Sequence, residues 1–236
     1  MSSPFTLNWA DDGHDVEKTN SQFDSLTPDY LKHPHKTGTT LMAASYDGGI
    51  MIAADTRTST GSYVAGRLTD KLTKLTDKIY CCRSGSSADT QAIAAIVKYH
   101  LSFYEEEIGE PASVGVAANI FRDLIYQYKY SLTAGIIVAG WDKRDGGQIY
   151  SISLGGMLKR LPVAFGGSGS VFIMGYVDSN FKPNMTRQEC RDFLVKGITL
   201  AIHRDGSSGG CARLANICES GVEREDVIYD DFPPLI

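Results

Sequence analysis

The alternation of apolar and polar positions predicts short strands where the regular part of this chain begins. Residues 40–46 and 49–55 are β-rich runs on either side of Asp47-Gly48. This dipeptide is typical of a hairpin turn in which both positions have positive φ. A third strand is predicted over residues 78–83, where apolar and β-forming side chains recur.

Two helices are predicted after these strands, because the apolar spacing changes from two to between three and four residues. Ser86 or Ser87 is the expected N-cap of the first helix, which runs to about Ile108 and is ended by Gly109 and Pro111. The second helix starts near Ser113. The buried face of the first is expected to contain Ile93, Ile96, Val97, His100 and Leu101.

The same order of elements repeats in the second half of the chain. Thr186 is the expected N-cap of a helix, with Glu189 at the capping-box position. The predicted helices of this half are residues 168–178 and 186–204. The predicted strands are residues 133–141, 148–154, 157–161, 211–219 and 223–229.

Strands and helices thus come in blocks: strands, two helices, strands, two helices, strands. Alternating βαβ units would instead indicate a parallel sheet. The blocks predict an α+β fold in which two antiparallel sheets lie face to face between pairs of helices. This four-layer αββα sandwich buries the apolar face of every element.

Composition narrows the class of protein. The 236 residues suit one domain, expected at 39–236, preceded by a polar, irregular leader at 1–38. The net charge of −5 argues against binding to nucleic acid or to an anionic membrane, and no apolar run is long enough to span a bilayer. Of the five cysteines, Cys81 and Cys82 are adjacent in a strand expected to be buried and the other three are scattered, which indicates reduced thiols in the cytosol or nucleus. No cofactor or metal is expected, because the leader histidines do not follow zinc-site spacing.

The border between leader and strands falls at Gly38-Thr39-Thr40. Cleavage after Gly38 would give Thr39 a free amine beside its own hydroxyl, so one residue would hold a nucleophile and a base. On the dipeptide alone, a loop that ends before a strand is the better explanation of this sequence. A catalytic role for Thr39 therefore depends on whether other residues of the chain could activate its hydroxyl.

Two charged residues are candidates for this activation. Asp55 ends the second strand, and Lys71 precedes the next. A lysine close to the nucleophile would favour loss of the hydroxyl proton, and a carboxylate would orient that lysine. Either Lys71 or the freed Thr39 amine could accept the proton. Each side chain alone would ordinarily be a solvated surface charge.

Other catalytic and binding motifs fit less well. The Gly-Ser segment at 166–170 lacks the Gly-Lys-Ser/Thr of a phosphate-binding loop, and Phe172 occupies the third-glycine position of a dinucleotide fingerprint. Residues 206–210 match Gly-x-Ser-x-Gly, but all five histidines precede Ser208. That order excludes the Ser-acid-His arrangement of an α/β-hydrolase.

Several segments together resemble the catalytic β-type subunits of the 20S proteasome, a family of N-terminal-nucleophile hydrolases. The resemblance extends from Thr39 to Phe232 and is strongest to the beta-1 type, which cleaves after acidic residues (caspase-like activity). Ser59 departs from the pattern, because threonine is more usual there. The matching segments are residues 38–40, 54–57, 69–72, 81–85, 88–91, 132–135, 167–170 and 205–210.

The resemblance implies a catalytic role for several positions. Thr39 would be the nucleophile, exposed when the chain removes residues 1–38 by autocatalysis, and Asp55 and Lys71 would complete its triad. The Gly85 amide would be the oxyanion donor. The supporting catalytic residues would be Ser168, Asp205 and Ser208.

The resemblance also implies how substrate is held. Arg83 would line the pocket for the residue before the cut and pair with Asp or Glu, so Arg83→Leu would shift preference towards apolar residues. The peptide would add as a strand beside Ser59 and Gly85. The remaining substrate-binding residues would be Thr58, Thr69, Thr73, Ser87 and Thr90.

The expected partners are other α and β proteasome subunits in stacked heptameric rings and unfolded polypeptide substrates, in the cytoplasm and nucleus. Two other functions are compatible with parts of the sequence. One is a ring subunit without activity, and the other is a self-processing hydrolase of a small amide. The presence of Thr39, Asp55 and Lys71 together disfavours the first, and the length of the resemblance disfavours the second.

Overall fold

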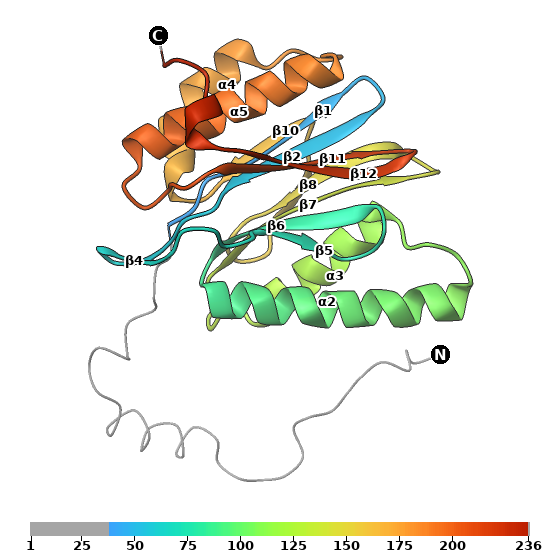
Figure 1. Ribbon diagram of the computed structural model, residues 1–236. Coiled ribbons are helices and arrows are strands. Elements are labelled where there is room, and N and C mark those ends of the chain that lie inside the picture. Colours follow the sequence, from blue (N-terminus) through green and yellow to red (C-terminus); the bar gives the residue numbers. More distant parts are fainter. Residues whose placement is uncertain (1–37, 236) are drawn as a thin grey trace, which may run out of the picture. The chain divides into compact units, whose positions relative to one another are not determined.

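Two five-stranded antiparallel sheets lie face to face in the computed structural model, which describes residues 38–235 (Figure 1). A separate hairpin is formed by β3 (Thr58–Thr60) and β4 (Tyr63–Gly66). The first sheet contains, in spatial order, β10 (Val163–Gly166), β1 (Leu41–Tyr46), β2 (Gly49–Asp55), β11 (Ala212–Cys218) and β12 (Gly221–Val227). The second contains β5 (Leu72–Lys74), β6 (Ile79–Gly85), β7 (Ala134–Asp142), β8 (Gly146–Ile152) and β9 (Leu158–Arg160).

Helices cover the outer face of each sheet (Figure 1). The second sheet is covered by α2 (Ser87–Ile108) and α3 (Val114–Gln127), and the first by α4 (Met174–Asn180) and α5 (Arg187–Arg204). The predicted four-layer αββα sandwich is therefore confirmed. Within the described part of the chain, no helix is long and apolar enough to cross a membrane.

Three apolar layers separate the four structural layers. One lies between the second sheet and its helices, one between the sheets, and one between the first sheet and its helices. Strand β2 contributes to two of them, because Ile52 points between the sheets and Ala53 towards α5. All seven residues of β2 are buried, as expected of a strand whose two faces are both covered.

The helices begin where the capping residues predict. The Ser86 side chain accepts a hydrogen bond from the Asp89 N–H at 3.3 Å, and Ser113 accepts one from Val116 at 3.2 Å. Thr186 and Glu189 form a complete capping box at the start of α5. These caps satisfy N–H groups that have no partner within the helix.

Several details differ from the prediction. The Asp47-Gly48 turn has positive φ only at Gly48, so the expected pair of positive φ values is wrong. Ile96 and His100 of α2 are exposed, because the helix packs on the sheet through Ile93, Val97 and Leu101.

Element boundaries also differ in two regions. The helix predicted over 168–178 is divided into a short 3-10 helix, η2 (Ser168–Phe172), and α4, with Ile173 between them. The strands β3, β4, β5 and β10 were not predicted, because runs of three or four residues contain too little alternation. A second short 3-10 helix, η3 (Tyr229–Asp231), follows β12.

Candidate active site

The β1–β2 hairpin brings Asp55 beside the residue that follows Thr39. In this register Leu41 pairs with Ala54, so Thr40 and Asp55 lie opposite each other just beyond the ladder. The Asp55 N–H donates to the Thr40 carbonyl at 3.2 Å, and the Thr40 N–H donates to Asp55 Oδ1 at 2.8 Å. The β1–β2 hairpin thus brings together two residues that are separated in the sequence.

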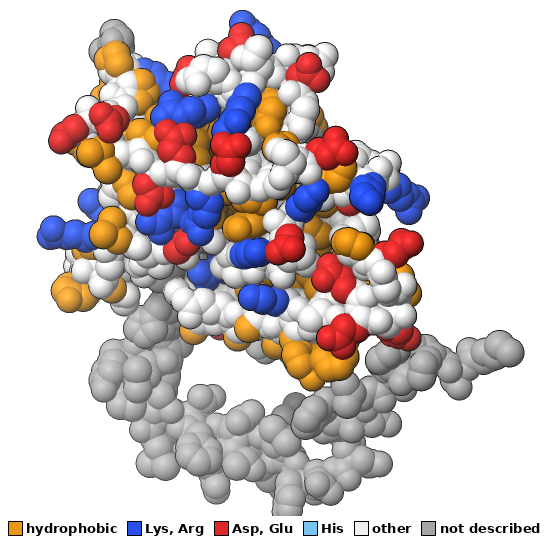
Figure 2. Space-filling view, turned by 45° about the vertical axis from the view of Figure 1, so that its right-hand side comes forward, with side chains coloured by type: hydrophobic (Ala, Val, Ile, Leu, Met, Phe, Trp, Pro, Cys, Tyr) orange, Lys and Arg blue, Asp and Glu red, His pale blue; other side chains and the backbone are white. Residues whose placement is uncertain are grey.

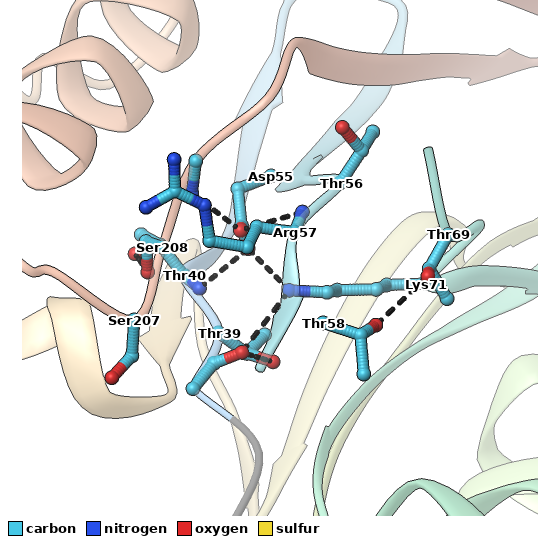
Figure 3. Close-up of polar contacts among 12 residues, drawn as sticks. Thr39, Thr40, Asp55, Thr56, Arg57, Thr58, Thr69, Lys71, Ser207 and Ser208 are labelled. Atoms are coloured by element: carbon cyan, nitrogen blue, oxygen red, sulfur yellow. Dashed lines mark hydrogen bonds and ion pairs between the residues drawn. The ribbon is translucent and has the colours of Figure 1, made fainter. Parts of the chain in front are cut away.

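Asp55 and Lys71 form a buried ion pair at this point (Figure 3). Lys71 Nζ lies 2.7 Å from Asp55 Oδ1, and the two side chains are 6% and 0% exposed. The other oxygen, Oδ2, accepts the N–H groups of Arg57 at 3.2 Å and Gly209 at 3.0 Å. With donors on both oxygens, the carboxylate holds a single orientation towards Lys71.

The Lys71 ammonium also points at the peptide bond before Thr39 (Figure 3). Nζ donates to the Gly38 carbonyl oxygen at 3.3 Å, and Thr39 Oγ1 donates to the same oxygen at 2.7 Å. Burial lowers the pKa of Lys71 from its ordinary value, opposed by the Asp55 charge and hydrogen bond. A lysine with a lowered pKa exchanges its proton more easily near neutral pH.

A second polar network holds the backbone of Thr39. Its N–H donates to Ser168 Oγ at 3.1 Å, and Ser168 Oγ donates to Asp205 Oδ2 at 2.7 Å. Ser208 Oγ donates to the same Asp205 oxygen at 2.7 Å and lies 2.7 Å from Thr40 Oγ1. Asp205 therefore connects two serines that contact consecutive residues of the threonine pair.

The glycines of the Gly-Ser segments allow the chain to approach these threonines closely. A Cβ at Gly167 would lie 2.1 Å from the Thr39 carbonyl oxygen, and Gly167 has a φ of +86°. A Cβ at Gly169 would lie 1.9 Å from Thr40 Oγ1. These segments therefore require glycine in order to pack around Thr39 and Thr40.

The Arg83 side chain is buried and held by neutral acceptors. Its Nε donates to Thr73 Oγ1 at 2.7 Å, Nη1 to Thr90 Oγ1 at 3.3 Å, and Nη2 to the Asp70 carbonyl at 3.0 Å. Arg83 is 9% exposed, and no carboxylate among residues 38–235 pairs with it. Its backbone N–H donates to the Lys71 carbonyl at 3.1 Å, so this cluster adjoins the ion pair.

The other residues predicted to bind substrate are less closely connected. Thr58 Oγ1 donates to Thr69 Oγ1 at 2.8 Å (Figure 3). Ser59 is buried in β3 and Ser87 begins α2, and among the described residues neither side chain hydrogen-bonds to the rest of this set. Gly85 ends β6 with a φ of +106°, and a Cβ there would lie 2.2 Å from the Thr133 carbonyl oxygen.

Some residues of the site were not predicted from the sequence. Thr40 hydrogen-bonds to Ser208 through its hydroxyl, and the Gly209 N–H donates to Asp55. Ser207 packs against Gly38. Asp70 supplies one acceptor to Arg83, and its only sequence signal is its place directly before Lys71. Within residues 38–235, no group of His, Cys, Asp or Glu side chains is arranged to hold a metal ion.

Fold and comparisons together identify the class. The four-layer arrangement is that of N-terminal-nucleophile hydrolases, and a family model described as "Proteasome subunit" matches residues 35–217. Proteasome subunit beta type-6 of Dictyostelium discoideum is 50% identical over 206 residues, 87% of this chain and 96% of the relative. Proteasome subunit beta type-1 of Saccharomyces cerevisiae is 50% identical over 198 residues, 84% and 92% respectively.

A third relative, proteasome subunit beta type-9 of Rattus norvegicus, is 49% identical over 197 residues, 84% of this chain and 90% of the relative. The chain therefore belongs to the proteasome subunit family and, within it, to the β-type subunits. The beta type-1, type-6 and type-9 relatives are similar to it to nearly the same degree.

Proposed function

We propose that this chain is a threonine endopeptidase subunit of the 20S proteasome core, activated by cleavage between Gly38 and Thr39. One observation carries this proposal. The buried Lys71–Asp55 pair and the Thr39 hydroxyl converge on the carbonyl oxygen of Gly38. In an inactive structural subunit, nothing would require a buried ion pair at this peptide bond, since the desolvation of two charges often costs more than their attraction returns.

Self-cleavage would proceed by transfer of the acyl group from nitrogen to oxygen. The Thr39 hydroxyl oxygen attacks the Gly38 carbonyl carbon, the C–N bond breaks, and the nitrogen takes up the hydroxyl proton. Water then hydrolyses the resulting ester, leaving a carboxylate on Gly38 and a free amine on Thr39. The 2.7 Å hydrogen bond from Thr39 Oγ1 to the Gly38 oxygen supports this step, because it holds the hydroxyl beside the carbonyl group that it would attack.

After cleavage, the same residues would act on substrate peptides. Lys71 would promote loss of the Thr39 hydroxyl proton, and Asp55 would orient Lys71. Ser168, Asp205 and Ser208 would hold the freed amine, since Ser168 already accepts the Thr39 N–H. The Gly85 amide would donate to the oxyanion, and the peptide would lie as an added strand near Ser59 and Gly85.

We propose that the subunit cleaves after acidic residues. The Arg83 guanidinium is buried among hydroxyl and carbonyl acceptors and has no carboxylate partner in the described part of the chain. A buried charge of this kind is stabilised by pairing with an opposite charge. The side chain of Asp or Glu before the scissile bond would supply it, with Thr73 and Thr90 fixing the guanidinium plane.

The proposed setting is a stacked ring assembly of α and β subunits that degrades unfolded polypeptides in the cytoplasm and nucleus. Large apolar side chains on α2 support extensive subunit contacts: Ile96, Tyr99 and Phe103 are 44%, 61% and 52% exposed. Figure 2 shows hydrophobic side chains gathered along the lower edge of this face, in the layer of α2 and α3. Apolar patches of this kind mark protein–protein contacts.

The test is the N-terminus and activity of the subunit in its assembled particle. Mass spectrometry is expected to find a chain that starts at Thr39. Thr39→Ala should retain residues 1–38 and lower cleavage of a post-acidic substrate by at least about 10³-fold, the loss typical of removing a nucleophile. Thr39→Ser, which keeps a hydroxyl, is the matched control and should mature and retain measurable activity. A particle that contains Thr39→Ala and cleaves this substrate normally would show that the chain is a structural subunit.

A further inference from the structure

Asp70 contacts the Arg83 guanidinium through its backbone carbonyl and the opposite sheet through its side chain. Its carbonyl oxygen accepts Arg83 Nη2 at 3.0 Å. Its carboxylate accepts the Leu72 N–H on Oδ1 at 2.9 Å and Arg224 Nη2 on Oδ2 at 2.8 Å. Arg213 Nη1 lies 3.8 Å from Oδ1. The residue thus connects the start of β5 with the β11–β12 hairpin.

The contact with Leu72 fixes the local backbone. A carboxylate that accepts the N–H two residues ahead forms an Asx turn, which holds the peptide groups of the turn in one orientation. The turn encloses Lys71, and it begins at the carbonyl that Arg83 uses. Losing the carboxylate would therefore let that carbonyl rotate away from Nη2.

The arginine contacts anchor the turn to the other sheet. Arg224 lies on β12 and Arg213 on β11, and Arg213 is itself held by Asp226 through contacts of 2.8 and 2.9 Å. Asp70 and Arg224 are 41% and 38% exposed, so their pairing contributes little to overall stability. Its consequence is geometric: it limits how far the Asp70 turn can move relative to the first sheet.

We infer that Asp70 is a positioning residue that sets the preference for acidic residues by holding the Arg83 guanidinium in place. This inference rests on the proposed role of Arg83. A guanidinium pairs with a carboxylate through two parallel N–H groups only when its plane is correctly oriented. Thr73, Thr90 and the Asp70 carbonyl define that plane, and only the Asp70 contact depends on a turn that a side chain maintains.

The experiment compares matched peptides with Glu or Leu before the scissile bond, cleaved by particles that contain each variant. Activity that is absent from the Thr39→Ala particle is attributed to this chain. Asp70→Ala is expected to lower the Glu-to-Leu ratio of kcat/KM by about tenfold, chiefly through KM for the Glu peptide, because small misplacements of a charged group are costly. Asp70→Asn keeps an acceptor for the Leu72 N–H but loses the oxygen that accepts Arg224, so the ratio should fall only about threefold, the same fall that is expected for Arg224→Gln.

Three further variants separate positioning from general damage. Asp77→Ala removes an exposed carboxylate after β5 that pairs with Lys74, and it should leave the ratio unchanged. Arg224→Gln should lower the ratio in the same direction by about threefold, as expected for loss of one exposed ion pair. In an Arg83→Leu background, Asp70→Ala should not change the ratio further, because the effect of Asp70 passes through Arg83.

The outcomes distinguish this inference from the proposed function. If Arg83→Leu lowers the ratio but Asp70→Ala leaves it within twofold, the role of Asp70 is refuted and the function stands. An equal fall caused by Asp70→Ala in the Arg83→Leu background also refutes it. If the unmodified particle shows no Thr39-dependent preference for Glu, the proposed specificity fails and this inference fails with it. If a particle that contains Asp70→Ala does not assemble, the Arg224→Gln particle provides the test. An unchanged Glu-to-Leu ratio in that particle would refute the anchoring role of Asp70.

Discussion

At the scale of single residues, the contact between Gly38 and Ser207 determines what can precede Thr39. A Cβ at position 38 would lie 1.8 Å from Ser207 Cβ and 2.9 Å from both the Cα and the carbonyl oxygen of Ser207. The φ of Gly38 is outside the left-handed region, so the backbone conformation itself does not require glycine. Glycine is required at position 38 because of the lack of space alone, since the backbone atoms and the Cβ of Ser207 cannot move away by a rotamer change.

Gly38→Ala should therefore displace the peptide bond that we propose Thr39 attacks, and slow the proposed cleavage by about tenfold or more. Ser207→Gly in the same chain removes the nearest atom and should restore part of the rate. Mass spectrometry of the N-terminus at successive times after synthesis measures both. Gly206→Ala is the matched control, because nothing lies within 4 Å of a Cβ at that position. Normal maturation of Gly38→Ala would show that the contact with Ser207 does not limit the reaction.

At the scale of elements, the start of α5 affects both stability and the site. Thr186 Oγ1 accepts the Glu189 N–H at 3.2 Å, and the Thr186 N–H donates to Glu189 Oε2 at 2.7 Å. The helix that begins here packs Leu194 and Ile198 against the first sheet, and its C-cap is Asp205, which binds Ser168 and Ser208. The cap therefore supports a helix whose far end lies in the site.

Thr186→Ala should lower the free energy of unfolding by about 1 kcal/mol, the usual loss when a helix cap is removed. Thr186→Ser retains the hydroxyl and should stay within about 0.5 kcal/mol of the unmodified chain. Urea unfolding followed by circular dichroism measures both values. If Ala and Ser were equally stable, the hydroxyl contact would not contribute to stability.

The sequence predicts long elements better than short ones. The helices starting at Ser86 and Thr186 have both apolar periodicity and a capping residue, and the structure contains both. Strand β10 has four residues and pairs with β1, which is far away in the chain, so no local pattern indicates it. The site follows the same rule. Lys71 belongs to a recognisable segment, whereas the contacts of Ser207 and Asp70 exist only after distant segments meet.

At the scale of the whole molecule, each of the three apolar layers contains one thiol. Cys81 lies between the second sheet and its helices, Cys82 between the sheets, and Cys190 between the first sheet and its helices. Burial raises the pKa of Cys81 and of Cys190 to about 12, and raises the pKa of Cys82 well above its ordinary value. A fourth buried thiol, Cys211, belongs to none of these layers, and Cys218 is partly exposed.

The reactivity of these three thiols during unfolding shows whether the four layers separate at the same urea concentration. At pH 8 the three thiols of the apolar layers remain protonated, and since the thiolate is the reactive form, an alkylating reagent should modify the partly exposed Cys218 before them. Strands β1, β2 and β7 each contribute to two apolar layers, so loss of one layer removes support from the next. We therefore expect Cys81, Cys82 and Cys190 to become reactive at the same urea concentration, as measured by mass spectrometry of labelled peptides. Labelling of one buried thiol at clearly lower urea would show that its layer opens separately.

The raised pKa values also predict the direction of the pH dependence. Between about pH 9 and pH 12 the thiols of the unfolded chain lose their protons while Cys81 and Cys190 in the folded chain keep theirs. The folded state then binds more protons than the unfolded state, so the free energy of unfolding contributed by these thiols falls as pH rises through this window. Below pH 9 the contribution is fully present. Replacing Cys81 with Ala should therefore flatten the loss of stability between pH 9 and pH 11, and an unchanged slope would mean that this thiol already ionises in the folded protein.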